Sequence, residues 1–216
     1  MNFRYLPLLF FIFLFISCNS ETKEKSIKQN AGQVAKDVKH TVGILPFKDI
    51  DSTLIQELKD RLQKQLPVEI SVLNTIPIPA SDYYKPRQRY IADNLLVFLK
   101  EINQGRFEKI IGVTTKDIST RKGDVVNWGI LGLGTCPGKA CVISSFRAGR
   151  NKVINDIFIK RMTTLALHEL GHTYGLEHCP SETCLMKDAK GKMNLDDGDY
   201  YCNKCRGYLL EMSILK

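Results

Sequence analysis

Apolar and polar positions after residue 40 follow the two periods of regular secondary structure. The segment HTVGILPF at 40–47 is rich in β-branched and apolar residues and predicts a strand. Between Ser52 and Pro67, apolar residues recur at three- and four-residue steps, which predicts a helix with Ser52 as its N-cap. The same criteria predict further strands at 68–79, 107–118 and 140–146, and further helices at 87–104 and 156–175. This order of strands and helices predicts an α/β fold with a twisted, mixed sheet.

The first 40 residues follow a different pattern. Arg4 precedes an apolar run, Leu6 to Ile16, that is shorter than the about 20 residues of a membrane-spanning helix and is typical of a secretory signal. Cys18 ends the run at a position that resembles a bacterial lipobox, where the cysteine becomes lipidated. The alternative is an ordinary cleaved signal with an incidental cysteine.

These features divide the chain. We predict a lipoprotein-type signal peptide at 1–17, a lipidated Cys18 with a flexible tether at 18–40, and a single domain at 41–216. The tether has too few apolar residues to form a core, and we expect His40 at its edge to be solvated. The protein is therefore expected to be exported and anchored to a membrane by lipid, facing the periplasm or the cell exterior.

Charge changes this picture little. The formal net charge is +8, but Lys and Arg are dispersed along the chain rather than interleaved with aromatic residues. We therefore expect a solvated, mildly cationic surface, no nucleic-acid partner and a monomer.

Three of the four histidines fall within HELGHTYGLEHC at 168–179. On a helix, His168 and His172 lie four residues apart on one face, so their imidazoles can share one zinc ion. Gly175 can end the helix in a left-handed conformation, which lets His178 turn back as a third ligand. Three protein ligands leave the fourth position open for water, which is the catalytic form of a zinc site, and Glu169 is placed to reach that water.

The segment HELGHTYGLEH resembles the His-Glu-x-x-His-x-x-Gly-x-x-His motif of the metzincins. The continuation HCPSETCLM and the later CNKC are similar to the archaemetzincins, zinc-dependent metallopeptidases, and the similarity extends over 107–208. The resemblance implies a zincin-like fold, with an active-site helix and a zinc-bound C-terminal region, and a peptide or protein substrate. It also implies Met186 as the methionine of the turn beneath the catalytic metal. A second, structural zinc would be bound by Cys179, Cys184, Cys202 and Cys205, giving two zinc ions per chain.

Cysteine pairing is the alternative to metal, because an exported chain permits disulfides. Two disulfides could close the same loops as the four-cysteine zinc site. The strain of a Cys-x-x-Cys bridge favours the metal. Cys136 and Cys141 are not part of the family pattern, and we predict a local disulfide between them, with two free thiols as the alternative.

The intact histidine triad and Glu169 predict a zinc metallopeptidase in which Glu169, as general base, activates a zinc-bound water. By analogy with metzincins, the strand CVISSF at 141–146 is expected to bind an extended peptide along its edge. The competing hypothesis is a membrane-tethered binding module that zinc stabilises without turnover. Such a module has no need of Glu169 or of an open coordination position.

Overall fold

The computed structural model describes residues 40–215, except 49, 150–153, 189–194 and 197–199. The predicted signal peptide, Cys18 and the tether up to residue 39 lie outside the described residues. Lys39–Lys216 forms one compact unit by itself. Within the described residues, no helix combines the length and the apolar character needed to cross a bilayer.

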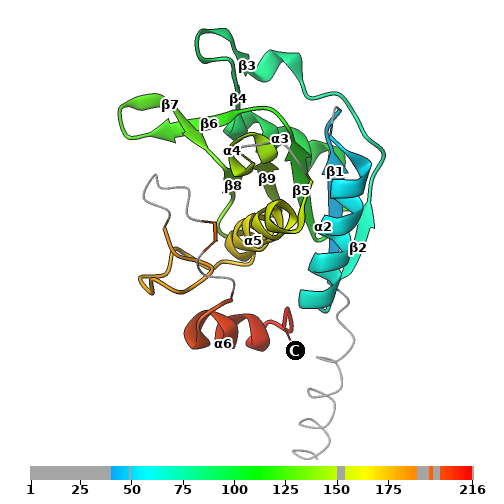
Figure 1. Ribbon diagram of the computed structural model, residues 1–216, viewed down its shortest axis with the longest axis vertical. Coiled ribbons are helices and arrows are strands. Elements are labelled where there is room, and N and C mark those ends of the chain that lie inside the picture. The colour runs from blue at the N-terminus through cyan, green and yellow to red at the C-terminus, as the bar shows by residue number, and fades with distance from the viewer. Residues whose placement is uncertain (1–39, 49, 150–153, 189–194, 197–199, 216) are drawn as a thin grey trace, which may run out of the picture. The chain divides into compact units, whose positions relative to one another are not determined.

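A five-stranded main sheet runs through the domain in the spatial order β2-β1-β5-β9-β8 (Figure 1). Its strands are β1 (Thr41–Pro46), β2 (Glu69–Val72), β5 (Lys109–Thr114), β8 (Gly132–Gly134) and β9 (Ala140–Ser144). Neighbouring strands pair in parallel, except that β8 is antiparallel to β9. The predicted mixed sheet is therefore confirmed, but β9 lies between two partners and β8 is the outer strand. The expectation that the strand at 141–146 offers a free edge was wrong.

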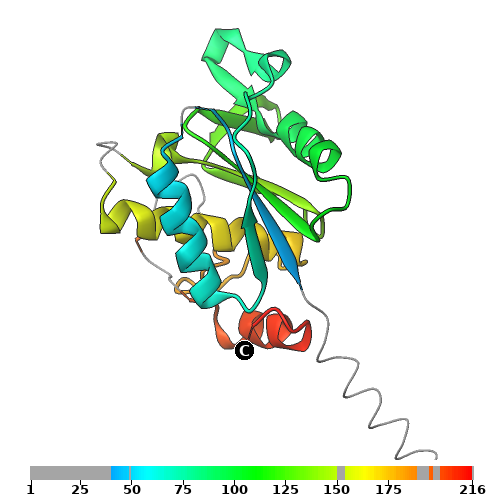
Figure 2. The ribbon, with the colours of Figure 1, turned by 90° about the vertical axis from the view of Figure 1, so that its right-hand side faces the viewer.

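Helices cover both sides of this sheet (Figure 2). On one side, α2 (Ser52–Gln65) and α5 (Asp156–Thr173) pack against the strand residues Val42, Ile44, Ile111 and Ile143. On the other side, α3 (Ala92–Asn103) packs against Leu45, Ile110 and Val142. Alternate residues of each strand point to opposite faces, so the apolar runs β1, β5 and β9 can be buried on both.

A second sheet, in the order β3-β4-β6-β7, was not predicted. It comprises β3 (Tyr83–Tyr84), β4 (Arg89–Ile91), β6 (Ile118–Lys122) and β7 (Val125–Ile130), and two 3-10 turns, η1 (Ala80–Asp82) and η2 (Lys85–Arg87), flank β3. The β4–β6 pair is parallel, and the β3–β4 and β6–β7 pairs are antiparallel. Since β7 leads into β8 after one residue, the second sheet continues into the outer strand of the main sheet.

Several predicted boundaries differ from the structure. The helix predicted at 87–104 begins only at Ala92, because residues 89–91 pair with β6 as β4. The strand predicted at 140–146 ends at Ser144, where α4 (Ser145–Ala148) follows. Asp51 rather than Ser52 caps α2, and its carboxylate accepts a hydrogen bond from the Thr53 N–H. The C-terminal helix α6 (Asn203–Glu211) was not predicted.

Candidate active site

The helix α5 carries the first part of the histidine motif. Its N-cap is Asn155, whose side chain accepts a hydrogen bond from the Phe158 N–H. It ends in a turn with Gly175 at φ +98°. The Gly175 N–H donates to the His172 carbonyl and the Leu176 N–H donates to the Gly171 carbonyl, which is the Schellman arrangement. The predicted left-handed glycine is confirmed, and the chain turns back after it.

The turn brings the three histidines together. One ring nitrogen from each of His168, His172 and His178 lies within 4.8 Å of the others. The Nε2 atoms of His168 and His172 are 3.1 Å apart. Three neutral imidazoles converging in this way fit a zinc ion by donor type and number.

Backbone carbonyls orient two of these rings. His168 Nδ1 lies 2.8 Å from the Leu185 carbonyl oxygen, and His172 Nδ1 lies 2.7 Å from the Leu176 carbonyl oxygen. A carbonyl accepts only from a protonated nitrogen, so Nε2 of each ring keeps its lone pair for a metal. Burial lowers the pKa of His168 to about 4 and also lowers that of His172, which favours the neutral form that ligates.

Glu169 is buried against β8, with 5% of its surface exposed. A Cβ atom on Gly132 would lie 2.6 Å from Glu169 Oε1, and one on Gly134 would lie 2.6 Å from the Glu169 carbonyl oxygen. Burial raises the pKa of the Glu169 carboxyl to about 8, while the Gly134 N–H donates to it and opposes that shift. The glycines of β8 therefore create the space in which this carboxyl lies beside the histidines.

Met186 packs against the active-site helix at Gly171. It is fully buried, and a Cβ atom on Gly171 would lie 2.6 Å from its sulfur. The residue before it, Leu185, supplies the carbonyl that orients His168. This segment thus supports the histidine site from below.

The four cysteines also converge, and their sulfur atoms lie within 4.8 Å of one another. The Cys179 and Cys202 sulfurs are 3.7 Å apart, far beyond the roughly 2.05 Å of a disulfide, and all four are free thiols. Cys202 is the N-cap of α6. The Cys205 N–H donates to the Cys202 sulfur and lowers the pKa of Cys202 to about 7. Four thiols at this spacing suit a closed tetrahedral zinc site better than the alternative pair of disulfides.

The predicted disulfide between Cys136 and Cys141 is absent, and the structure has both as free cysteines. Cys141 is buried within β9, opposite Gly134 of β8. Cys136 is exposed and lies beyond β8 in the turn, where its thiol donates to the Leu176 carbonyl at 3.4 Å. The pairing was inferred from sequence spacing, which cannot show that β8 and β9 direct the two thiols to different places.

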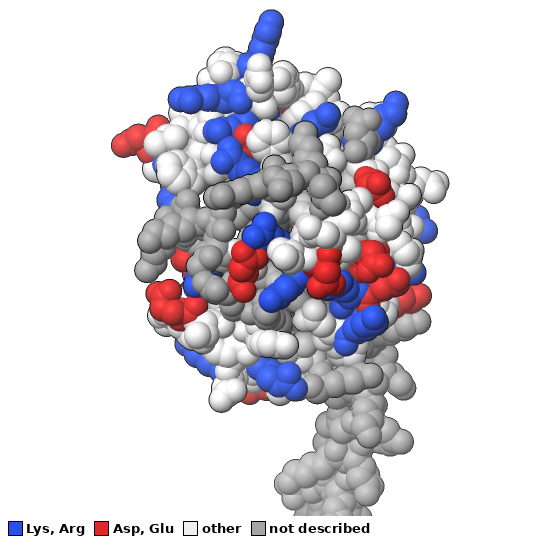
Figure 3. All heavy atoms as spheres, in the orientation of Figure 1, with Lys and Arg blue, Asp and Glu red and all other residues white. Residues whose placement is uncertain are grey.

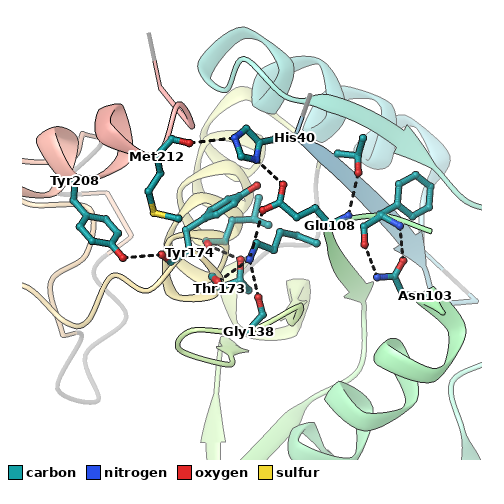
Figure 4. A network of polar contacts seen from close by, with 12 residues as sticks. His40, Asn103, Glu108, Gly138, Thr173, Tyr174, Tyr208 and Met212 are labelled. Carbon is teal, nitrogen blue, oxygen red and sulfur yellow. Dashed lines mark hydrogen bonds and ion pairs between the residues drawn. The ribbon is translucent and has the colours of Figure 1, made fainter. Parts of the chain in front are cut away.

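Behind the helix end, a polar network joins distant segments of the chain (Figure 4). Lys109 Nζ donates to the Gly138 and Thr173 carbonyls at 2.9 and 3.0 Å and lies 4.6 Å from the centre of the Tyr174 ring. Burial lowers the pKa of Lys109. His40 Nδ1 lies 2.5 Å from a Glu108 carboxylate oxygen, so the expectation of a solvated His40 was wrong.

The histidines and Glu169 line a cleft of about 840 Å³ that extends along β8 to β7. The imidazoles and Glu169 could be predicted from the sequence, whereas the roles of Gly132, Gly134 and Lys109 could not. The Gly-x-Gly spacing of β8 was the available signal for the two glycines. Lys109 and the Leu185 carbonyl have partners that are distant in sequence, so no local pattern in the sequence identifies their roles.

Comparison with known proteins agrees with this geometry. The profile of Peptidase family M54 matches residues 41–211. The chain belongs to this family. It is accordingly a zinc metallopeptidase, and the fold and family resemblance predicted from the sequence are confirmed.

The chain is also similar to individual proteins named archaemetzincin. The chain is 28% identical over 177 residues to the archaemetzincin of Natronomonas pharaonis, covering 78% of this chain and 99% of that one. It resembles the crystal structure of archaemetzincin from Methanopyrus kandleri with a TM-score of 0.69 and 24% identity, covering 82% of this chain and 97% of that one. The archaemetzincin of Archaeoglobus fulgidus, complexed with malonate, gives a TM-score of 0.67 and 25% identity, covering 78% and 99%.

Proposed function

We propose that His168, His172 and His178 hold the catalytic zinc and that Glu169 is the general base for peptide-bond hydrolysis. The observation that carries this proposal is the convergence of three ring nitrogens within 4.8 Å, beside a buried carboxyl and inside a cleft. Zinc, when bound there, supplies Lewis acidity that makes water a better nucleophile and a carbonyl a better electrophile.

The residues of the chain supply the other parts of the reaction. Glu169 takes a proton from the attacking water and returns it to the departing amine, so one carboxyl acts as base and then as acid. The backbone of β8, the outer strand of the main sheet, offers hydrogen bonds to an extended peptide. The substrate is a peptide or a protein, held against β8 with its scissile bond near Glu169.

A second zinc at Cys179, Cys184, Cys202 and Cys205 is proposed as structural, giving two zinc ions per chain. Two of the thiols, those of Cys184 and Cys205, are buried, and the Cys202 N–H donates to the Cys184 sulfur at 3.3 Å. Met186 is proposed as the turn methionine that packs beneath the active-site helix. We expect the protein to act as a monomer.

For the N-terminal region, we propose that residues 1–17 are a signal peptide and that Cys18 is lipidated. Residues 18–40 would then tether the domain, 41–216, to a membrane facing the periplasm or the exterior. The support is the apolar run that ends at Cys18 and the polar segment after it. Metabolic labelling with a fatty-acid analogue tests this, because Cys18→Ser should abolish the label. Labelling that survives this substitution contradicts the assignment.

Glu169→Gln tests the catalytic proposal, because it keeps the shape of the side chain and removes its basicity. The zinc-loaded chain should cleave a library of internally quenched peptides, and this variant should lose about 10²–10⁴-fold in kcat/KM while keeping its zinc. Glu177→Gln, an exposed neighbour of His178, is the matched control and should retain activity. Unchanged turnover in Glu169→Gln would contradict the role of Glu169. Absence of any cleavage by the wild-type protein would favour the binding module.

A further inference from the structure

The active-site cleft continues beyond the histidines to the second sheet. Its lining includes Gly132 and Gly134 beside Glu169 and also Arg89, Gly129 and Arg147. We propose that this end of the cleft binds a carboxylate of the peptide substrate and that Arg147 and Arg89 determine that specificity. The inference rests on the proposed function, since it concerns the substrate of the same site.

Two guanidinium groups converge on one carboxylate there. Arg147 Nε and Nη2 donate to the two oxygens of Asp117 at 2.6 and 2.8 Å. Arg89 Nε donates to Asp117 Oδ2 at 2.8 Å, and its Nη1 donates to the Asn127 carbonyl at 2.9 Å. One negative charge therefore faces two positive charges, so the group keeps an excess positive charge.

This excess charge is only partly solvated. The side chains of Arg89 and Arg147 are 21% and 26% exposed, and that of Asp117 is 9% exposed. Two like charges held together at this depth repel each other, and a second carboxylate would relieve the repulsion. Each guanidinium has five N–H donors, so both keep donors that Asp117 and Asn127 do not use. Arginine is the side chain best suited to carboxylates in this setting.

Gly129 of β7 lies directly against the arginine pair. A Cβ atom at this position would overlap the Arg147 guanidinium and would lie 3.1 Å from Arg89 Cζ. The glycine therefore lets the backbone of β7 approach the two arginines closely. A peptide that pairs along β8 and extends toward β7 would pass over this point.

The spacing of Gly129 and Gly132 along the chain limits the distance between the arginine pair and the scissile bond. Gly129 and Gly132 are three residues apart, so their Cα atoms are at most about 11 Å apart, which corresponds to roughly three residues of an extended peptide. Antiparallel pairing is the commoner arrangement of two strands, and it would place residues C-terminal to the scissile bond toward Gly129. The carboxylate is therefore expected two or three residues past the bond, on that side.

The surrounding surface supports the same sign of charge. Arg87, Arg121 and Lys122 also line the cleft and are exposed on the second sheet and its turns. On the face drawn in Figure 3, the charged residues of the upper part, where the second sheet lies, are mainly Lys and Arg. Clusters of Asp and Glu lie lower on the same face. A cationic wall raises the local concentration of acidic peptides as well as their affinity.

Paired peptides that differ only in one carboxylate test the proposal. Internally quenched peptides would carry Glu or Gln at each of three positions on either side of the scissile bond, with amidated ends. A second series would compare a free C-terminal carboxylate with its amide at the same distances. The zinc-loaded wild-type chain should prefer one acidic position by about 10-fold in kcat/KM, two or three residues past the bond. Preference in the first series identifies a side chain and preference in the second identifies a chain end.

Arg147→Gln should remove that preference by lowering turnover of the acidic peptide to the level of its neutral counterpart. Asp117 keeps Arg89 as a partner in this variant, so its buried carboxylate is not left unpaired. Arg61→Gln is the matched control, because Arg61 pairs with Asp156 on α2 and α5 and does not line the cleft. If Arg147→Gln does not fold, the exposed double variant Arg121→Gln, Lys122→Gln should still reduce the preference about 2–3-fold, and more at low salt.

Three outcomes overturn the inference. A wild-type protein that cleaves acidic and neutral peptides equally at every position refutes the carboxylate subsite but leaves the peptidase intact. Equal losses on both peptides in Arg147→Gln would make the arginine pair purely structural. Preference for an acid on the N-terminal side would refute the antiparallel placement. A wild-type chain that cleaves none of the peptides instead contradicts the proposed function.

Discussion

The histidine group and the cysteine group are close in sequence but differ in their surroundings. The histidines line a large cleft, His178 is exposed, and carbonyl groups orient two of the rings. Of the four cysteines, Cys202 and Cys205 lie at the start of α6, while Cys179 and Cys184 precede it in the chain. Two of the four thiols are buried, and the Cys202 N–H donates to the Cys184 sulfur. An open, three-donor set leaves room for a substrate, whereas a closed, four-donor set has no vacant position. The difference supports the proposed catalytic role of the first group and the proposed structural role of the second.

Removal of metal should give the largest effect. Brief treatment with a chelator should abolish peptide hydrolysis by removing about one zinc per chain from the open histidine group, because that site is accessible from the cleft. The second zinc should remain, and the thermal melting temperature should change little. Zinc analysis alongside activity and melting measures this. Simultaneous loss of both zinc ions would remove the distinction between the groups.

Cys205→Ser should destabilise the domain by roughly 3–5 kcal/mol, as expected for loss of a structural metal. Cys205 is buried in α6 and its substitution removes one of four converging thiols. Denaturant unfolding and zinc content are the measurements. Cys136→Ser is the control, since that exposed thiol donates only to a carbonyl and serine can do the same. A Cys205→Ser protein of normal stability with both zinc ions would refute the structural role.

Gly132→Ala should lower kcat by about 100-fold, with stability and zinc content close to those of the wild type. The new Cβ atom would meet Glu169 Oε1 at 2.6 Å and displace the carboxyl from its position. Misplacement by about 1 Å can cost this much. Steady-state kinetics on one peptide measures the effect, and normal kcat would show that the carboxyl position is not critical.

Gly207→Ala is the same substitution beside the cysteine group. It should stabilise the protein rather than impair it, and its effect should be the smallest of those predicted here. Gly207 lies within α6 and nothing approaches within 4 Å of an added Cβ atom. Alanine should stabilise the helix by roughly 0.5–1 kcal/mol, because glycine loses more backbone freedom on folding. A small rise in melting temperature with unchanged kcat is expected, and a fall would indicate contacts that alanine disturbs.

Much of the main sheet and the histidine group could be predicted from local patterns. Helix α5 has no breaker before Gly171, and His168, His172 and Gly175 stand at spacings fixed by helix geometry. Buried strands such as β1 and β5 are continuous apolar runs, which are visible without knowledge of their partners.

The second sheet and the arginine pair could not be predicted in this way. Strands β3 and β4 have only two and three residues. β7 leaves Val125, Val126 and Trp128 exposed, so apolar and polar residues do not alternate as in a half-buried strand. Arg89, Asp117 and Arg147 come from separate elements, and their meeting depends on how the two sheets join. Helix α6 buries only Cys205 and Leu209, too few for a recognisable apolar stripe.

Lys109 joins the end of the active-site helix to the turn between β8 and β9, since its ammonium group binds a carbonyl from each. These hydrogen bonds hold the end of α5 and the β8–β9 turn together. The width of the cleft at that end is therefore fixed before a substrate binds. Differences in substrate specificity should accordingly arise at the opposite end of the cleft, on the β6–β7 hairpin. Related enzymes with different substrate specificities are expected to differ in that hairpin and to keep the hydrogen bonds made by Lys109.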